Sequence, residues 1–277
     1  MKTVLKRLGA GAGLALCAGV AAEVLGRKAF SRLVSSDVQT LLVGSSRGET
    51  KIVSEEMLAG LPEPVQRYLR YTGVVGKPFV RTVHLRQKGK MLLGAGKLWI
   101  PLKAQQWYSV QPPGFVWEGT LHIGPIPIVR ARDMYRRGEG HMLIKAASLF
   151  TVADAKGTEV DQGEMMRHLS EMMWFPSAFL EDNISFEADD STSARVTLTD
   201  HGRTATGTLF FDAEGRLTEF VGRRYAGGDL ETWSVPVTAY GEMEGLNLPV
   251  RGKAVWKLAK GDQEYIDVTI TELHHLV

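Results

Sequence analysis

Hydrophobic and polar residues alternate one by one in the segment that begins at residue 79, and this two-residue period constrains the fold more than any other feature. Neighbouring side chains of a β-strand point to opposite faces, so the alternation predicts a strand with one mainly apolar face. The apolar set consists of Phe79, Val83, Leu85 and Met91, with Arg81 at the same parity. The opposite, mainly basic set consists of Thr82, His84, Arg86, Lys88 and Lys90. We expect the basic face to be a solvated sheet surface, with contact to a polyanion or to anionic lipid as the alternative.

Short segments of strand character follow along most of the remaining chain and are separated by turn sequences. Gly and Pro favour turn conformations, and they recur at residues 111–114 (Gln-Pro-Pro-Gly), 124–125 (Gly-Pro) and 212–215 (Asp-Ala-Glu-Gly). The expected strands are residues 96–100, 104–110, 115–123, 126–136, 184–187, 194–199, 204–211, 216–225, 231–240, 250–257 and 264–273. This rhythm is typical of an antiparallel meander and not of alternating βαβ units.

A helical period interrupts the strands near the middle of the chain. Residues 161–164 (Asp-Gln-Gly-Glu) have the spacing of a capping box, which predicts a helix with Asp161 as its N-cap. Apolar residues then recur at helical spacing, namely Met165, Met166, Leu169, Met172 and Met173. Trp174 and Phe175 precede Pro176, which disfavours further helix. The stripe is expected to pack on the sheet, and flexible Met side chains also suit a variable apolar ligand.

These patterns predict a mainly β fold of the α+β class. Many antiparallel strands must curl or split to bury their apolar faces, so we expect a curved antiparallel sheet or a partly open barrel. A helical insertion is expected near residues 161–180, and a short helix near residues 64–70 that stops at Gly73. The expected division is residues 1–26 as a signal peptide or membrane anchor, 27–53 as a linker, and 54–277 as a single β-rich domain.

The first residues have the charge pattern of an export signal. Lys2, Lys6 and Arg7 precede an uncharged, mainly apolar run over residues 8–22. The run is short for a comfortable transmembrane helix, and Arg27 follows soon after it. Four alternatives stay open: a cleaved signal peptide, an uncleaved anchor, a lipoprotein signal at Cys17, and no export. The first two are favoured and predict a cell-envelope location, either periplasmic (extracytoplasmic) or anchored to the inner membrane.

Composition excludes several classes of function. The formal net charge of +2 is too small to indicate a nucleic-acid partner. Cys17 is the only cysteine, so an intrachain disulfide and a Cys-cluster zinc site are excluded. The sequence contains neither a phosphate-binding Gly-rich loop followed by Lys-Ser or Lys-Thr nor a Gly-x-Ser-x-Gly motif. We therefore expect no cofactor and no metal.

Asp133 is the most informative charged residue. Strand parity places it on the same face as Val129 and Ala131, so we expect it to point inward. A buried carboxylate needs a cationic partner because desolvating a charge is costly. The candidate partners are Arg67, Arg167 and Arg224. The favoured role is an ion pair that fixes the helix on the sheet, and a ligand headgroup or catalytic role is the alternative.

Four motifs resemble an uncharacterised bacterial family that is catalogued as a domain of unknown function. They are residues 62–69 (Pro-Glu-Pro-Val-Gln-Arg-Tyr-Leu), 113–117 (Pro-Gly-Phe-Val-Trp), 132–135 (Arg-Asp-Met-Tyr) and 161–176, from Asp-Gln-Gly-Glu to Trp-Phe-Pro. The resemblance spans nearly the whole expected domain and implies no assigned chemistry. In its order of strands, helix and strands, the chain is also similar to periplasmic lipoprotein-sorting carriers, which are curved half-barrels that hold acyl chains. This second likeness is architectural.

Three hypotheses for function follow. The first is a non-enzymatic envelope protein that binds or carries a lipid-like apolar molecule in a curved β cavity. Its expected ligand-binding residues are Met165, Met166, Leu169, Met172, Met173, Trp174 and Phe175. The second is an envelope hydrolase or modifying enzyme that uses Asp133, Glu171 and His168 as acid and base groups. The third is a scaffold that binds another envelope protein along a sheet edge. The expected partners are an apolar small molecule and, through the N-terminus, the membrane.

Overall fold

The computed structural model describes the backbone of residues 2–45, 50–93 and 98–277, and within these ranges the side chains from residue 19 onward. The helical elements are α1 (Lys2–Val43), η1 (Glu55–Leu58), α2 (Glu63–Thr72), α3 (Thr158–Glu171), η2 (Met172–Trp174) and η3 (Pro176–Leu180). The strands in the first half are β1 (Thr82–Leu93), β2 (Leu98–Ser109), β3 (Gly114–Ile123), β4 (Ile126–Arg136), β5 (Glu139–Ala146) and β6 (Phe150–Lys156). Those in the second half are β7 (Ile184–Ala188), β8 (Ser193–Asp200), β9 (Arg203–Phe211), β10 (Leu217–Ala226), β11 (Asp229–Met243), β12 (Leu246–Leu258) and β13 (Gly261–Leu276).

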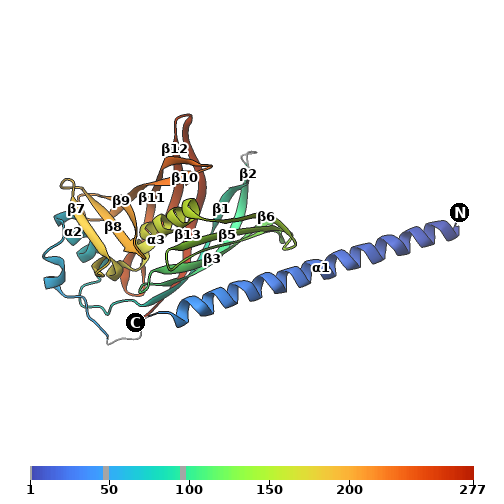
Figure 1. Cartoon of the computed structure of the whole chain (residues 1–277), viewed down its shortest axis with the longest axis horizontal. Helices are drawn as coiled ribbons and strands as arrows, with labels where there is room; N and C mark the ends of the chain where they lie inside the picture. Colours follow the sequence, from blue (N-terminus) through green and yellow to red (C-terminus); the bar gives the residue numbers. More distant parts are fainter. Residues whose placement is uncertain (1, 46–49, 94–97) are drawn as a thin grey trace.

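All the strands of the described chain belong to one antiparallel sheet. Its order is β6-β5-β4-β3-β2-β1-β13-β12-β11-β10-β9-β8-β7. Each half of the chain is a meander, and the halves meet where β1 pairs with β13, with Thr82 opposite Leu276. The sheet is curved (Figure 1). Strands β6 and β7 form its two edges and do not pair with each other, so the sheet is not closed. The predicted fold class, a mainly β curved antiparallel sheet with a helical insertion, is confirmed.

Helix α3 connects the two edges of the sheet and lies within its curve (Figure 1). It packs against β4, β5, β9 and β10, which come from both halves of the chain. The Met stripe points into the core, where Met165, Met166 and Leu169 are fully buried. The helix therefore joins the two meanders through one hydrophobic core.

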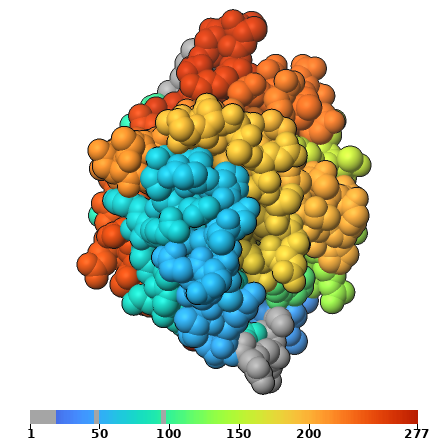
Figure 2. Space-filling model, turned by 90° about the vertical axis from the view of Figure 1, so that its left-hand side faces the viewer, coloured from blue at the N-terminus to red at the C-terminus, as the bar shows by residue number. Residues whose placement is uncertain are grey.

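Helix α2 covers one end of this core. It ends at Gly73, whose φ of 75° is in the left-handed region that favours glycine. Tyr68 and Leu69 are fully buried, and the Tyr68 hydroxyl donates a hydrogen bond of 3.3 Å to the Met173 carbonyl. Figure 2 shows this end from outside, with the segment around α2 (blue to cyan) beside the segment that contains β7 and β8 (yellow). This end of the molecule is thus covered by helices and loops.

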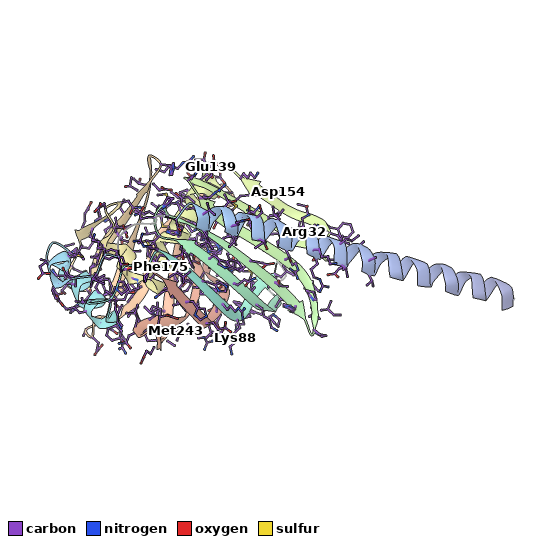
Figure 3. All side chains as sticks on the ribbon, turned by 90° about the horizontal axis from the view of Figure 1, so that it is seen from below. Arg32, Lys88, Glu139, Asp154, Phe175 and Met243 are labelled. Carbon is purple, nitrogen blue, oxygen red and sulfur yellow. The ribbon has the colours of Figure 1, made fainter. Side chains whose placement is uncertain are left out.

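Helix α1 continues to Val43 and therefore includes much of the segment expected as a linker, residues 27–53. The serines at 35 and 36 suggested a loop, but they lie within the helix. Phe30, Val34 and Leu41 are buried against Val116 and Leu143 on the outer face of the sheet. Their spacing puts them on one side of a helix, and tertiary packing outweighs the weak helix propensity of serine. Figure 3 shows α1 lying along the strands and extending beyond them.

The described part of the chain contains no helix with the length and hydropathy required to cross a bilayer. Residues 46–49 of the expected linker lie outside the described residues, and so do the side chains of residues 1–18, including Cys17. The export role of the N-terminus and the expected domain boundaries stay predictions.

Two further expectations were wrong in their details. Residues 139–156 form β5 and β6, which the turn-rich pattern did not predict. Asp161 is not the N-cap of α3, because that helix begins at Thr158 after Gly157. Instead, Asp161 accepts a 2.7 Å hydrogen bond from the Gly140 backbone N–H and pairs with Arg203 at 3.0 Å. Its carboxylate therefore fixes the helix to β5 and β9.

Candidate functional site

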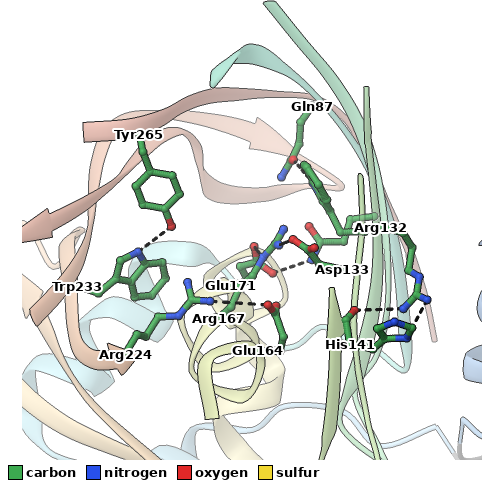
Figure 4. Close-up of polar contacts among 12 residues, drawn as sticks. Gln87, Arg132, Asp133, His141, Glu164, Arg167, Glu171, Arg224, Trp233 and Tyr265 are labelled. Carbon is green, nitrogen blue, oxygen red and sulfur yellow. Dashed lines mark hydrogen bonds and ion pairs between the residues drawn. The ribbon is translucent and has the colours of Figure 1, made fainter. Parts of the chain in front are cut away.

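A cavity of about 300 Å³ lies between α3 and the inner face of the sheet. Its apolar wall includes Met91, Ile144, Trp233, Val235, Trp256 and Ile266. A polar cluster lies on the side of the cavity that faces α3 (Figure 4). It consists of Glu164, Arg167 and Glu171 from α3, Asp133 from β4 and Arg224 from β10. The volume is at the lower end of the range of about 300–1,000 Å³ that small-molecule sites occupy. The site thus combines a mainly apolar enclosure with a few charged groups.

Arg167 holds the polar cluster together. Its Nη1 donates to Asp133 Oδ2 at 2.8 Å, and its Nε donates to Glu171 Oε1 at 2.9 Å. The guanidinium also lies 5.0 Å from the ring centroids of Phe115 and Trp117, within reach of a cation–π interaction. Burial alone would lower the pKa of Arg167, but the charges of Glu171 and Asp133 outweigh this effect and raise the pKa, so the guanidinium stays charged. This arginine therefore joins α3, β3 and β4.

Glu171 is fixed by two neutral donors in addition to Arg167. Its Oε2 accepts hydrogen bonds from Gln106 Nε2 at 2.7 Å and from the Tyr108 hydroxyl at 3.0 Å. Burial and the adjacent Glu171 carboxylate raise the pKa of Tyr108 well above its ordinary value. With all these contacts satisfied, Glu171 is a positioned acceptor and not a free base.

Glu164 and Arg224 make a looser pair. Arg224 Nη2 lies 3.9 Å from Glu164 Oε1, and its guanidinium is 4.6 Å from the Trp233 ring centroid and 5.9 Å from that of Trp256. Burial, followed by the charge of Asp133, raises the pKa of Glu164 to about 7. Burial also raises the pKa of Asp133, against the opposing effect of Arg167.

Three buried atoms of this cluster have no hydrogen-bond partner among the described residues. They are Asp133 Oδ1, Glu164 Oε2 and Arg224 Nε. Buried polar atoms are normally hydrogen-bonded, so an unpaired set at one cavity wall is notable. A small rearrangement would let these two acceptors and one donor bind the polar end of a ligand.

Tryptophan side chains supply much of the apolar wall. Four of the six tryptophans line the cavity, namely Trp117, Trp174, Trp233 and Trp256. Trp117 Nε1 donates to Gln87 Oε1 at 3.1 Å, and Trp233 Nε1 donates to the Tyr265 hydroxyl at 3.0 Å. Because these N–H groups are already satisfied, the rings contribute apolar surface to the cavity.

The structure separates the sequence-predicted ligand-binding residues into two groups. Met173 and Trp174 line the cavity. The others are buried in the core and do not line it: Met165, Met166, Leu169, Met172 and Phe175. The larger part of the Met stripe is therefore core packing, as its helical spacing allowed.

The predicted arginine partners also have different positions. Arg167 pairs with Asp133, and Arg224 pairs with Glu164 in the same cluster. Arg67 lies elsewhere, where it pairs with Glu63 at 3.2 Å and donates to the Ser191 carbonyl at 3.0 Å. The Asp133 side chain is 16% exposed, since it faces the cavity and is not enclosed in packed core.

The acid and base groups considered for an enzyme do not meet in one place. His168 does not line the cavity that Asp133 and Glu171 share. It is surrounded by aromatic rings, with its own ring stacked 6.3 Å from that of Phe115, and burial lowers its pKa to about 4. The imidazole is thus a neutral core group.

Several residues of the site were missed in the sequence. Glu164 was not singled out as a site residue, yet its side chain is only 8% exposed and lines the cavity. Trp233 and Val235 share one face of β11, so strand parity could have indicated their common side. Trp256 and Tyr265 approach the site only through the register of β12 with β13, which the sequence did not specify.

A family described as a family of unknown function, DUF6544, matches residues 51–268. The chain belongs to this family. The match covers α2, α3, the cavity and the sheet except the last part of β13, and it confirms the resemblance that the sequence motifs indicated. No curated protein matches the chain.

Solved structures with similar sheets come from several bacteria. A DUF1329 family protein from Desulfovibrio piger has a TM-score of 0.44 at 8% identity, and covers 77% of this chain and 92% of its own. A putative outer membrane lipoprotein-sorting protein domain from Vibrio parahaemolyticus has a TM-score of 0.41 at 7% identity, with 71% and 86% covered. A LolA superfamily protein from Nitrosomonas europaea has a TM-score of 0.41 at 8% identity, with 82% and 95% covered. These likenesses are too distant to carry an assignment of function.

Proposed function

We propose that this protein binds a lipid-like apolar molecule in the cavity between α3 and the sheet and carries it within the cell envelope. The observation that carries the proposal is the cavity itself, with a mainly apolar wall and a charged cluster at one side. An acyl chain would contact the tryptophan rings and Met173, and each buried CH₂ contributes about 0.8 kcal/mol to binding. A polar headgroup would meet the unpaired atoms of Asp133, Glu164 and Arg224.

The test is a binding experiment with the purified full chain. A bromine-labelled fatty acid should quench tryptophan fluorescence, because four of the six tryptophans line the cavity. Native mass spectrometry before and after solvent extraction would show whether the protein is purified with a bound lipid.

Ala131→Phe places a large side chain in the cavity wall, so it should weaken binding by about tenfold or more. Ala239→Phe on β11 is the matched control, because Ala239 is exposed and lies away from the cavity. The proposal fails if Ala131→Phe binds as tightly as the unmodified chain, or if no form binds a fatty acid and none carries a lipid.

The location in the cell envelope rests on the charge pattern before residue 23 and is part of this proposal. A reporter enzyme fused after Gly48 should be active on the extracytoplasmic side. Activity of such fusions only in the cytoplasm would contradict export.

A further inference from the structure

Large apolar side chains are exposed on three adjacent hairpins at one end of the sheet. They are Leu98, Ile123, Ile126, Phe150 and Val152, which we call the tip surface. Each is between 57% and 70% exposed. The hairpins are β1–β2, β3–β4 and β5–β6, which follow one another in the sheet order. The pairing registers place the last paired residues of the three hairpins at the same end of the sheet, since Leu93 is opposite Leu98, Ile123 is opposite Ile126 and Ala146 is opposite Phe150.

Turns between strands usually carry polar residues, so exposed apolar side chains at the strand ends beside adjacent turns indicate a surface that something covers. The opposite end of the sheet, near α2, is already covered by the protein (Figure 2). The tip surface projects from separate hairpins and is not one flat patch. That shape fits shallow insertion into a soft medium better than it fits a rigid protein face.

Helix α1 leaves the sheet at this same end. An added Cβ at Gly26 would lie 2.6 Å from the Ser148 carbonyl oxygen, so the helix is in close contact with the β5–β6 hairpin there. The residues before Gly26 extend past the hairpins (Figures 1 and 3), and Val20 and Leu25 on this extension are exposed. The tip surface and the helix extension therefore point toward the same side.

A basic groove of about 740 Å³ lies on the outer face of the sheet behind the tips. Its lining includes Lys88, Lys90, Lys103 and Arg251, with Asp267 as the one carboxylate among the lining residues. Asp267 is paired with Arg251 at 2.9 Å and lies 4.0 Å from Lys90, so the four cations of the groove exceed its one carboxylate. Such a groove complements an anionic lipid headgroup layer.

The cavity also reaches toward the tips. Met91 and Leu92 line it from the last residues of β1, and Ile144 lines it from the last residues of β5. Docking at the tips would therefore bring the cavity close to whatever the tips enter.

We propose that the tip surface inserts into the interface of an anionic phospholipid bilayer, with the basic groove toward the headgroups. This docking is a second contact with the membrane, separate from any insertion of α1. It also differs from ligand binding in the cavity, so either proposal can fail alone.

The experiment places an environment-sensitive fluorophore on the full chain after Cys17→Ser. One label is attached at Phe150→Cys, a second at Ile126→Cys, and the control at Ile52→Cys. Ile52 is exposed and apolar, and it pairs with Pro78 just before β1 at the opposite end of the sheet. Vesicles contain phosphatidylcholine with phosphatidylglycerol, and a brominated lipid serves as the quencher.

Residues 126 and 150 should show blue-shifted emission and at least about twofold stronger quenching than residue 52, since interfacial residues enter about 5–10 Å. Lys88→Glu combined with Lys103→Glu should reduce binding to the anionic vesicles but not to phosphatidylcholine alone. Equal signals at all three positions would overturn the proposal, because the chain would then be tethered by α1 alone. Shielded tips in a dimer without vesicles would also overturn it in favour of a second copy as the occupant. Circular dichroism checks that each variant is folded.

Discussion

Arg167 Nη1 donates a hydrogen bond of 2.8 Å to Asp133 Oδ2, and this contact joins the inserted helix to the sheet. The two residues are 34 positions apart in the chain, and each has a second role. Arg167 also binds Glu171, while Asp133 faces the cavity. The same ion pair therefore stabilises the fold and forms part of the proposed ligand site.

Loss of Arg167 should destabilise the protein more than loss of Asp133. Arg167→Met leaves both Asp133 and Glu171 without their cation, and we expect the free energy of unfolding to fall by about 3–5 kcal/mol. Asp133→Asn leaves Arg167 paired with Glu171, so a fall of about 1–3 kcal/mol is expected. Urea unfolding measures the free energy of unfolding of both variants. Equal losses for the two variants would contradict the central position of Arg167.

The stability of the protein should depend on pH through Glu164. Its pKa in the folded protein is about 7, above its ordinary value of 4.5, because burial and Asp133 disfavour the charged form. A raised carboxyl pKa contributes stability below pH 4.5, and this contribution is lost as pH rises through 7. Glu164→Gln should remove this part of the dependence.

Between pH 5 and pH 8, the free energy of unfolding of the unmodified chain should therefore fall by roughly 1–3 kcal/mol more than that of Glu164→Gln. Chemical unfolding of both proteins at each pH is the measurement. A constant difference between them across this window would show that Glu164 titrates normally.

His168 should have the opposite effect at lower pH. Burial lowers its pKa from 6.5 to about 4, so its contribution to stability is complete above pH 6.5 and is lost as pH falls toward 4. His168→Phe keeps an aromatic ring among aromatic neighbours and cannot take up a proton. On acidification from pH 7 to pH 4, the free energy of unfolding of this variant should fall by about 2–3 kcal/mol less than that of the unmodified chain, as measured by chemical unfolding at each pH. If both proteins lose the same stability on acidification, His168 is not the neutral group described above.

The docking of α1 on the sheet should depend on Asp37. Its carboxylate lies 3.3 Å from Arg132 Nε, and the Arg132 side chain is only 2% exposed. Asp37→Ala should weaken the docking of α1 on the sheet by about 1–3 kcal/mol. The loss is limited to this range because Arg132 keeps its hydrogen bonds to His141. Hydrogen exchange in residues 27–43 should then become faster.

Glu23→Ala is the control for this helix. It removes a solvent-exposed ion pair with Arg27, so almost no change in the stability of α1 is expected. Similar exchange in both variants would mean that α1 is held by its apolar contacts alone.

Residue patterns predicted those parts of the fold that depend on local period. The alternation around Val83 and Leu85 predicted a strand, and the stripe from Met165 to Met173 predicted the inserted helix. The parity of Asp133 predicted its inward direction and an arginine partner, which is Arg167. These features repeat within a few residues, so one sequence is enough to recognise them.

Other features depend on contacts between distant segments. The burial of Glu164 follows from the position of α3 between two meanders, which no local period encodes. Likewise, α1 contains weak helix formers and is held in place by Phe30, Val34 and Leu41. The tryptophans of β11 and β12 reach the cavity because the sheet curves, and the sequence does not specify the amount of curvature.

The pairing of β1 with β13 has a consequence for how the chain acquires its structure. Thr82 lies opposite Leu276, so the middle of the sheet forms from segments nearly two hundred residues apart. During synthesis, each meander can begin to pair on its own, but β1 exposes an unpaired edge until β13 has been made. Contacts this distant in sequence form slowly, and unpaired edges favour aggregation. We therefore expect the newly made chain to require protection by a chaperone until its last strand is complete.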